Sequence, residues 1–181
     1  MRVQRGLILA SIALMGLLLG LHSAVGPAGA SQQSLAAFLP GSGQVAGWTI
    51  QANSEQYAPS SDKLHVIYDG GDGEYITAGV TEALKRTYKR DKAYLTVTIH
   101  KMGTDWQKAK AFYTKKKAAI EEQEGYTTVT VKNAGCYGPL AGMTLGYSWT
   151  GYYMVTYLAT DKGAGGDVKQ FIEKVAGKMA Q

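Results

Sequence analysis

The sequence holds very few of the residues that build disulfides. Cys136 is the single cysteine among 181 residues, and one cysteine cannot close an internal disulfide, so the hydrophobic core must hold the fold together. A small domain that depends on internal disulfides for its stability is therefore excluded. The simplest interpretation of Cys136 is a buried small hydrophobic residue, and a reactive thiol is the alternative.

Histidine is also scarce, and motifs of catalytic chemistry are missing. Only His65 and His100 follow residue 30, and the sequence contains no H-E-x-x-H, G-x-S-x-G or phosphate-cradling glycine motif. His100 falls on the polar side of a predicted strand, so we expect it to be exposed, and His65 is expected at the start of a helix. No cofactor is implied. A hydrolase that uses His65 or His100 with nearby carboxylates remains an alternative, because catalytic sets are recognised by geometry rather than by order in the chain.

Excess charge of one sign is small. The formal net charge of +5 includes Arg2 and Arg5, so the chain after residue 30 carries +3. The lysine run at 115–117 is expected to form a solvated face. Nucleic-acid binding would need a stronger basic stripe, so nucleic acid is not an expected partner.

What the sequence does have at its start is an export signal. Arg2 and Arg5 precede an uncharged apolar stretch over 7–21, and the small residues Ala28-Gly29-Ala30 follow. This pattern predicts a signal peptide over 1–30, cleaved after Ala30, and a single secreted or periplasmic domain over 31–181. An uncleaved anchor is the alternative, but a membrane span usually needs about 20 apolar residues. After cleavage no integral membrane segment is expected.

Alternation of apolar and polar residues predicts two β-hairpins. In the first, over 80–102, the apolar Leu95, Val97 and Ile99 alternate with polar residues, and the turn falls at 90–92. The second joins 143–149 to 152–159 with a turn near Thr150-Gly151. A half-buried strand over 48–52 and a short strand around Val129 are also expected.

Helices are predicted where apolar residues recur at helical spacing. One short helix follows Ser34; a second begins near residue 64 and is broken by the glycines of 69–73. A third starts at a capping box formed by Thr104 and Gln107, and a fourth starts at an Asp167 cap. The segment 136–139, with two residues that break regular structure, is expected to be a loop.

Two hairpins separated by a helix, with further helices on both sides, predict the fold class. We expect an α+β domain with an antiparallel sheet built from two hairpins plus extra strands, and with helices packed on it. A parallel sheet would require strands and helices to alternate regularly, and they do not.

Several short motifs share their order and spacing with a known family. They are F-L-P at 38–40, G-W at 47–48, Leu64 followed by Y-D-G at 68–70, Tyr75, Gly79, M-G at 102–103 and A-F at 111–112. In this arrangement the segment 38–112 resembles an exported bacterial family catalogued as domain of unknown function 6599. Asp69 stands where that family tends to have asparagine. The resemblance implies an exported α+β domain and no particular activity.

Two groups of residues are candidates for a site. Tyrosine is frequent, with 12 residues against 3 phenylalanines, and aromatic rings gather in the second hairpin; the candidates for ligand binding are Tyr147, Trp149, Tyr153 and Tyr157. Part of this set could form an aromatic platform, and core packing is the alternative. The carboxylates Asp69, Asp72 and Glu74 on a glycine-rich segment are a weaker candidate for calcium, with a plain turn as the alternative. We therefore expect a non-catalytic binding module of the cell envelope or secretome, whose partner is an unknown protein or small molecule.

Overall fold

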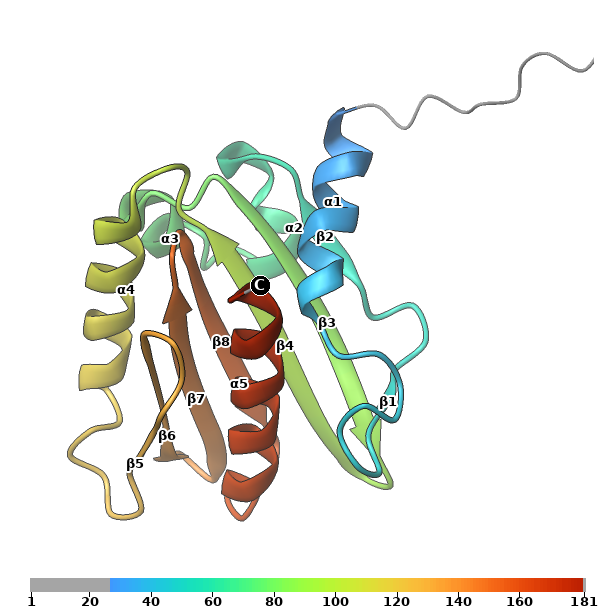
Figure 1. Cartoon of the computed structure of the whole chain (residues 1–181), viewed down its shortest axis with the longest axis vertical. Helices are drawn as coiled ribbons and strands as arrows, with labels where there is room; N and C mark the ends of the chain where they lie inside the picture. The colour runs from blue at the N-terminus through green and yellow to red at the C-terminus, as the bar shows by residue number, and fades with distance from the viewer. Residues whose placement is uncertain (1–26, 181) are drawn as a thin grey trace, which may run out of the picture.

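The structure is a computed structural model that describes residues 27–180 (Figure 1). The predicted signal peptide over 1–30 therefore lies almost wholly outside the described residues. Within the described part of the chain, no helix is both long enough and apolar enough to cross a membrane.

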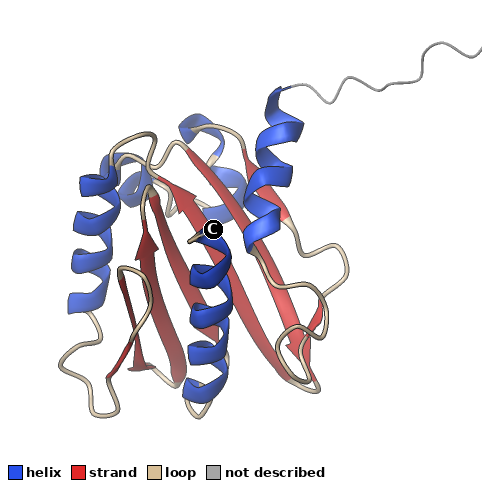
Figure 2. Cartoon of the chain, in the orientation of Figure 1, coloured by secondary structure: helices blue, strands red, loops and turns tan. Residues whose placement is uncertain are grey.

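One antiparallel sheet and the helices on its two faces make up the described residues (Figure 2). The elements in chain order are α1 (Pro27–Phe38), β1 (Thr49–Ile50), β2 (Gln56–Ala58), the 3₁₀ turn η1 (Ser61–Lys63), α2 (His65–Tyr68), α3 (Gly73–Ala78), β3 (Glu82–Arg90), β4 (Ala93–Lys101), α4 (Trp106–Ala118), β5 (Thr127–Val129), β6 (Ala134–Leu140), β7 (Met143–Thr150), β8 (Tyr153–Ala159) and α5 (Gly165–Met179). The strand order is β1-β3-β4-β8-β7-β6-β5, and β2 also pairs with β3. The predicted α+β class with an antiparallel sheet is confirmed.

Both predicted hairpins are present and form the centre of the sheet. β3 pairs with β4 from Glu82 opposite Lys101 to Arg90 opposite Ala93, and β7 pairs with β8 up to Thr150 opposite Tyr153. The two hairpins join through β4 and β8. Alternation alone was enough to predict these strands, because each has one face against a core.

One face of the sheet is covered by α1 and α5 (Figure 1). The predicted apolar stripe of α5 is buried here, with Phe171 against Trp48 and Tyr88 at ring-centroid distances of 5.9 and 4.7 Å. β7 carries Gly146 where α5 comes closest, and a Cβ on that residue would lie 2.5 Å from Cγ1 of Val168. This face therefore holds the larger and more tightly closed core.

The opposite face is covered by α2, α3 and α4, mainly at one end of the sheet. α2 ends at Tyr68, where Asp69 has a φ of 39° and Gly70 a φ of 85°, which confirms the predicted break. The chain becomes helical again in α3, because Tyr75 packs there against Phe112 of α4. This helix was not predicted, since the glycines of 69–73 favour a loop.

The starts of two helices differ from their predicted caps. The N-cap of α4 is Asp105 rather than Thr104, and its carboxylate accepts hydrogen bonds from the backbone N–H groups of Gln107 and Lys108 at 2.9 and 3.3 Å. α5 begins at Gly165, so Asp167 lies inside its first turn instead of at its cap. The Asp167 carboxylate is held there by Arg90 at 2.7 and 2.6 Å, which ties α5 to the first hairpin.

The predicted loop over 136–139 is wrong, because these residues belong to β6. Tertiary packing explains the glycine at 135, since a Cβ there would approach Cγ2 of Ile172 to 2.9 Å. Pro139 lies beyond the residues of β6 that pair with β5, so one side of the strand is an edge at that point. A proline is tolerated at such an edge because its missing N–H is not needed by a neighbour.

Candidate functional site

His100 lies inside a cluster of aromatic rings on the α2–α4 face of the sheet. Its side chain is completely buried, stacks on Tyr75 with 5.1 Å between ring centroids, and meets Phe112 edge-on at 6.2 Å. The prediction that His100 is an exposed strand residue is wrong. Alternation placed it on the correct face of β4, but α3 and α4 cover that end of the face.

Both ring nitrogens of His100 are occupied. Nδ1 lies 3.0 Å from the carbonyl oxygen of Met154, which can only accept, so Nδ1 carries the proton. Nε2 then accepts a hydrogen bond from the Tyr68 hydroxyl. Burial lowers the pKa of His100 from 6.5 to about 4, and the nearby Lys116 charge lowers it further against the opposing effect of the Met154 hydrogen bond. His100 is therefore neutral and has no free nitrogen for a substrate.

A charged group closes the outer side of this ring cluster. Lys116 of α4 lies over the rings of Tyr75 and Phe112, at 5.1 and 5.5 Å from their centroids. Its ammonium pairs with Glu74 of α3 at 2.5 Å, and Lys115 pairs with the same carboxylate at 3.1 Å. The hydrogen bond from Lys116 holds the pKa of Glu74 below its usual value.

This pairing also bears on the calcium hypothesis for Asp69, Asp72 and Glu74. Among the residues that the structure describes, no group of three His, Cys, Asp or Glu side chains is arranged to hold a metal ion. Glu74 is engaged by two lysines, which compete with a cation for its oxygens. The geometry gives this candidate no support.

His65 and His100 do not form one site. His65 is exposed on α2, and its Nδ1 lies 3.0 Å from the backbone oxygen of Asp62. Neither imidazole is hydrogen-bonded to a carboxylate in the described residues. The geometry required for a hydrolase, a histidine with an acid in reach, is not assembled here.

The four aromatic candidates of the second hairpin divide between the two faces of the sheet. Tyr147 and Trp149 belong to the α2–α4 face, whereas Tyr153 and Tyr157 face α1 and α5. Tyr157 is completely buried and its hydroxyl lies 3.0 Å from the Ser148 hydroxyl. As a result the four rings share no surface. Tyr147 and Trp149 are buried at 7% and 9% exposure, and Tyr153 is half-buried against Phe38.

Trp149 lies under Trp106, the first residue of α4. The two indoles stack with 6.2 Å between centroids and 16° between planes. Trp149 is 9% exposed and Trp106 is 46% exposed. Trp106 therefore shields Trp149 from solvent.

Cys136 is buried and free, as the simplest interpretation of the sequence predicted. Burial raises the pKa of its thiol, partly offset by the neighbouring hydroxyls of Tyr113 and Tyr126. A raised pKa keeps the sulfur in its unreactive thiol form.

The strand pairing shows that the helical cover of the α2–α4 face stops partway along the sheet. Three rows of side chains cross the strands β3, β4, β8 and β7 on this face. The first row is buried and consists of Ala83, His100, Met154 and Trp149. The second row is Lys85, Thr98, Thr156 and Tyr147, and the third is Thr87, Thr96, Leu158 and Leu145. Exposure increases along these rows toward the turn of the first hairpin. Tyr94 and Leu158 reach 39% and 37%.

We call the uncovered part of this sheet the open face; it consists of Lys85, Thr87, Tyr94, Thr96, Thr156 and Leu158. Tyr147, a candidate from the sequence, lies at its border beside Thr156. The alternation of Thr96 and Thr98 with apolar residues predicted a polar side of β4. It could not show which part of that side the helices leave bare.

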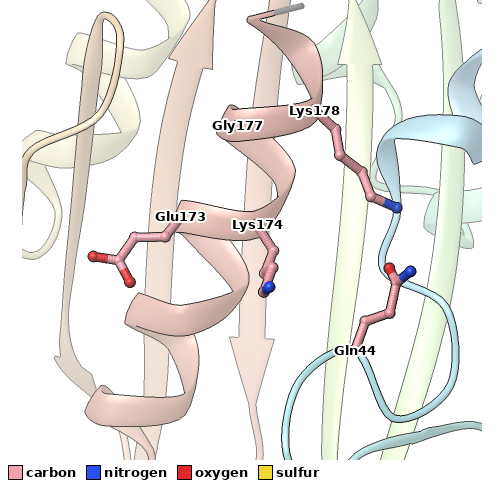
Figure 3. Close-up of a pocket in the computed structure, with 5 residues that line it drawn as sticks. All are labelled: Gln44, Glu173, Lys174, Gly177 and Lys178. Atoms are coloured by element: carbon pink, nitrogen blue, oxygen red, sulfur yellow. The ribbon is translucent and has the colours of Figure 1, made fainter.

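A shallow polar depression lies on the other face of the molecule, between α5 and the loop after α1 (Figure 3). Its volume is about 380 Å³, and it is lined by Gln44, Glu173, Lys174, Gly177 and Lys178. The Lys178 ammonium donates to the carbonyl oxygen of Leu39 at 2.7 Å, which joins α5 to the end of α1. This lysine therefore serves the packing of the helices, and none of the residues that line the depression is aromatic.

Comparison with known proteins shows what the fold resembles. No family model matches the chain, and no curated protein sequence matches it. The crystal structure of the extracellular domain of PknH from Mycobacterium tuberculosis is similar, with 15% identity, a TM-score of 0.57, and coverage of 82% of this chain and 96% of that domain. A GTP binding regulator from Thermotoga maritima aligns with 10% identity, a TM-score of 0.49, and coverage of 86% and 93%. At 15% identity the first likeness establishes a shared fold.

Proposed function

We propose that this chain is an exported, non-catalytic domain that binds a partner through its open face. The basic, apolar and small-residue pattern of residues 1–30 supports export. The likeness of the fold to an extracellular domain agrees with it. The resemblance of segment 38–112 to the exported domain of unknown function 6599 family supports the same placement, and we propose membership of that family.

The observation that carries the binding proposal is the incomplete cover of the sheet. β4 and β8 are central strands, and their α1–α5 face is fully buried. On the other face the same strands expose Tyr94 and Leu158. Exposed apolar side chains on two neighbouring central strands, where no helix covers them, support an interaction site.

The geometry favours binding over hydrolysis. The neutral His100 has both nitrogens engaged by Tyr68 and Met154, and α3 and α4 separate it from solvent. The open face itself presents hydroxyls, lysines and two apolar side chains, and these groups offer contacts rather than an acid–base pair.

Binding to cell envelopes from the source organism tests this proposal. We expect the purified mature domain to cosediment with envelopes, and the variant Leu158→Glu to lose most of this binding because a charge replaces an exposed apolar contact. Ile50→Glu is the matched control, since Ile50 is also 37% exposed and lies opposite Tyr88, whose side chain belongs to the α1–α5 face. Equal binding by wild type and Leu158→Glu, with both folded, would overturn the proposal.

A further inference from the structure

The open face carries positive charge without a matching negative charge. Its three rows contain Lys85, and Lys89 lies opposite the exposed Tyr94 one position further along the same face. None of the positions on these rows is a carboxylate. Lys85 donates to the backbone oxygen of Ile67 at 3.1 Å, so its charge is not neutralised by an acid.

The border of the open face also carries net positive charge. Glu74 is the carboxylate of that border, and it is shared by Lys115 and Lys116. Two cations for one anion leave one positive charge on α4, and α4 packs against β7, the strand that carries Tyr147. A partner of the open face must therefore offer negative charge.

Between these lysines the open face carries threonine hydroxyl groups. Thr87 and Thr96 lie opposite one another with their hydroxyl oxygens 3.0 Å apart, and Thr156 lies on the adjoining row. An apolar helix docked here would remove these hydroxyls and the Lys85 ammonium from water and offer them no hydrogen bond in return. A ligand with its own hydroxyls would pair with them instead.

The exposed ring of Tyr94 adds a flat apolar contact at the same place. Aromatic faces bind the C–H faces of a sugar ring, while the phenol hydroxyl stays in water. Leu158 is exposed on the neighbouring strand β8, on the row of Thr87 and Thr96. Hydroxyls, a ring face and an excess of lysines over carboxylates together match a chain of sugar rings that bear carboxylates.

The geometry points to an acidic polysaccharide as the occupant of the open face, an inference that rests on the proposed binding function. Its carboxylates would pair with Lys89 and with the lysines at the Tyr147 border, its hydroxyls with the threonines, and one ring would stack on Tyr94. No bond is made or broken.

Titration calorimetry of the mature domain against three polymers tests this inference. Polygalacturonate supplies sugar rings with carboxylates, dextran supplies sugar rings without charge, and polyglutamate supplies carboxylates without sugar. We expect polygalacturonate to bind at low salt and to lose roughly 10-fold in affinity at high salt, and dextran and polyglutamate to bind at least about 10-fold more weakly.

Variants locate the binding. Lys89→Glu and Tyr94→Ala should each weaken polygalacturonate binding by about 10-fold. Lys174→Glu is the matched control, because Lys174 is an exposed lysine of α5 on the opposite face of the sheet (Figure 3), and it should bind as the wild type does. Thermal unfolding confirms that each variant is folded.

The outcomes separate this inference from the proposed function. Equal binding of polyglutamate would overturn the polysaccharide in favour of an acidic peptide. Envelope binding that is lost in Leu158→Glu but is not competed by polygalacturonate would overturn the ligand class and leave the binding function intact. Polygalacturonate binding that is as sensitive to Lys174→Glu as to Lys89→Glu would show a diffuse charge effect and overturn the site.

Discussion

His100 shows how a single residue takes its properties from the elements around it. Its position on β4 follows from alternation, yet the side chain is neutral and buried because α3 and α4 lie over it with the rings of Tyr75 and Phe112. In water an imidazole with an ordinary pKa of 6.5 would titrate near neutral pH. Burial of His100 moves that titration to about pH 4.

This burial predicts that acid destabilises the protein through His100. The unfolded chain binds a proton near pH 6.5 and the folded chain only near pH 4, so the unfolded state holds more protons between these values. The free energy of unfolding should therefore fall as the pH drops from 6.5 to 4, by about 3 kcal/mol from this residue. Urea unfolding at several pH values in this window measures the slope.

A pair of variants isolates the contribution of His100. His100→Gln retains a donor and an acceptor but cannot titrate, so its stability should depend less steeply on pH in the same window. His65→Gln, at an exposed position of α2, is the control for replacing a histidine by glutamine. An unchanged slope in His100→Gln would contradict the assignment of a buried neutral imidazole.

At the scale of elements, the contact between α5 and the sheet depends on glycine. The stripe of α5 predicted from spacing is buried, with Val168, Phe171 and Ile172 fully inside. The partners of this stripe were not predictable, because a glycine in a strand gives no alternation signal. Gly146 of β7 is such a partner, and it lies under Val168 and Ile172.

Gly146→Ala should destabilise the protein by roughly 1–3 kcal/mol, because the new methyl would start 2.5 Å from Cγ1 of the stiff Val168 side chain and 3.3 Å from Cβ of Tyr157. Gly177→Ala on the exposed side of α5 is the control. Its Cβ meets nothing within 4 Å, and alanine favours the helix by roughly 1 kcal/mol. Chemical denaturation of both variants measures the difference, and equal stability for the two would refute the close approach of α5.

Local sequence patterns predicted some elements of the fold and failed for β6 and α3. The hairpins and the break after Tyr68 follow from alternation and from glycine, both of which act locally. β6 was predicted as a loop because its glycines and Pro139 favour a loop in isolation. Its pairing with β7 makes it a strand. α3 was not predicted for the same kind of reason. Tertiary contacts stabilise it, since Tyr75 stacks on His100 and on Tyr68, with 3.8 Å between the ring centroids of the two tyrosines.

At the scale of the whole molecule, the two faces of the sheet are covered unequally. α1 and α5 close one face, whereas α2, α3 and α4 leave part of the other open. α1 matters for this arrangement because it runs from Pro27 to Phe38 across the predicted cleavage point. Leu35 and Leu39, which pack into the core, follow that point.

Cleavage after Ala30 should therefore leave the fold intact. Mass spectrometry of the exported protein should give a chain that begins at Ser31, and a chain made from Ser31 onward should unfold with the same midpoint as the exported one. A mature chain that still begins at Met1 would contradict the predicted signal peptide. A chain that begins after Leu35 would contradict the role of α1 in the core.

Alternation, helical spacing and side-chain polarity act along short stretches of chain, so they were enough to predict the α+β class, the two hairpins, the apolar stripe of α5 and the burial of Cys136. They could not predict that His100 is buried, that Tyr147 and Trp149 lie on the opposite face from Tyr153 and Tyr157, or that part of one sheet face is open. A strand pattern shows which side chains share a face, but which faces are covered depends on where helices distant in the chain come to pack.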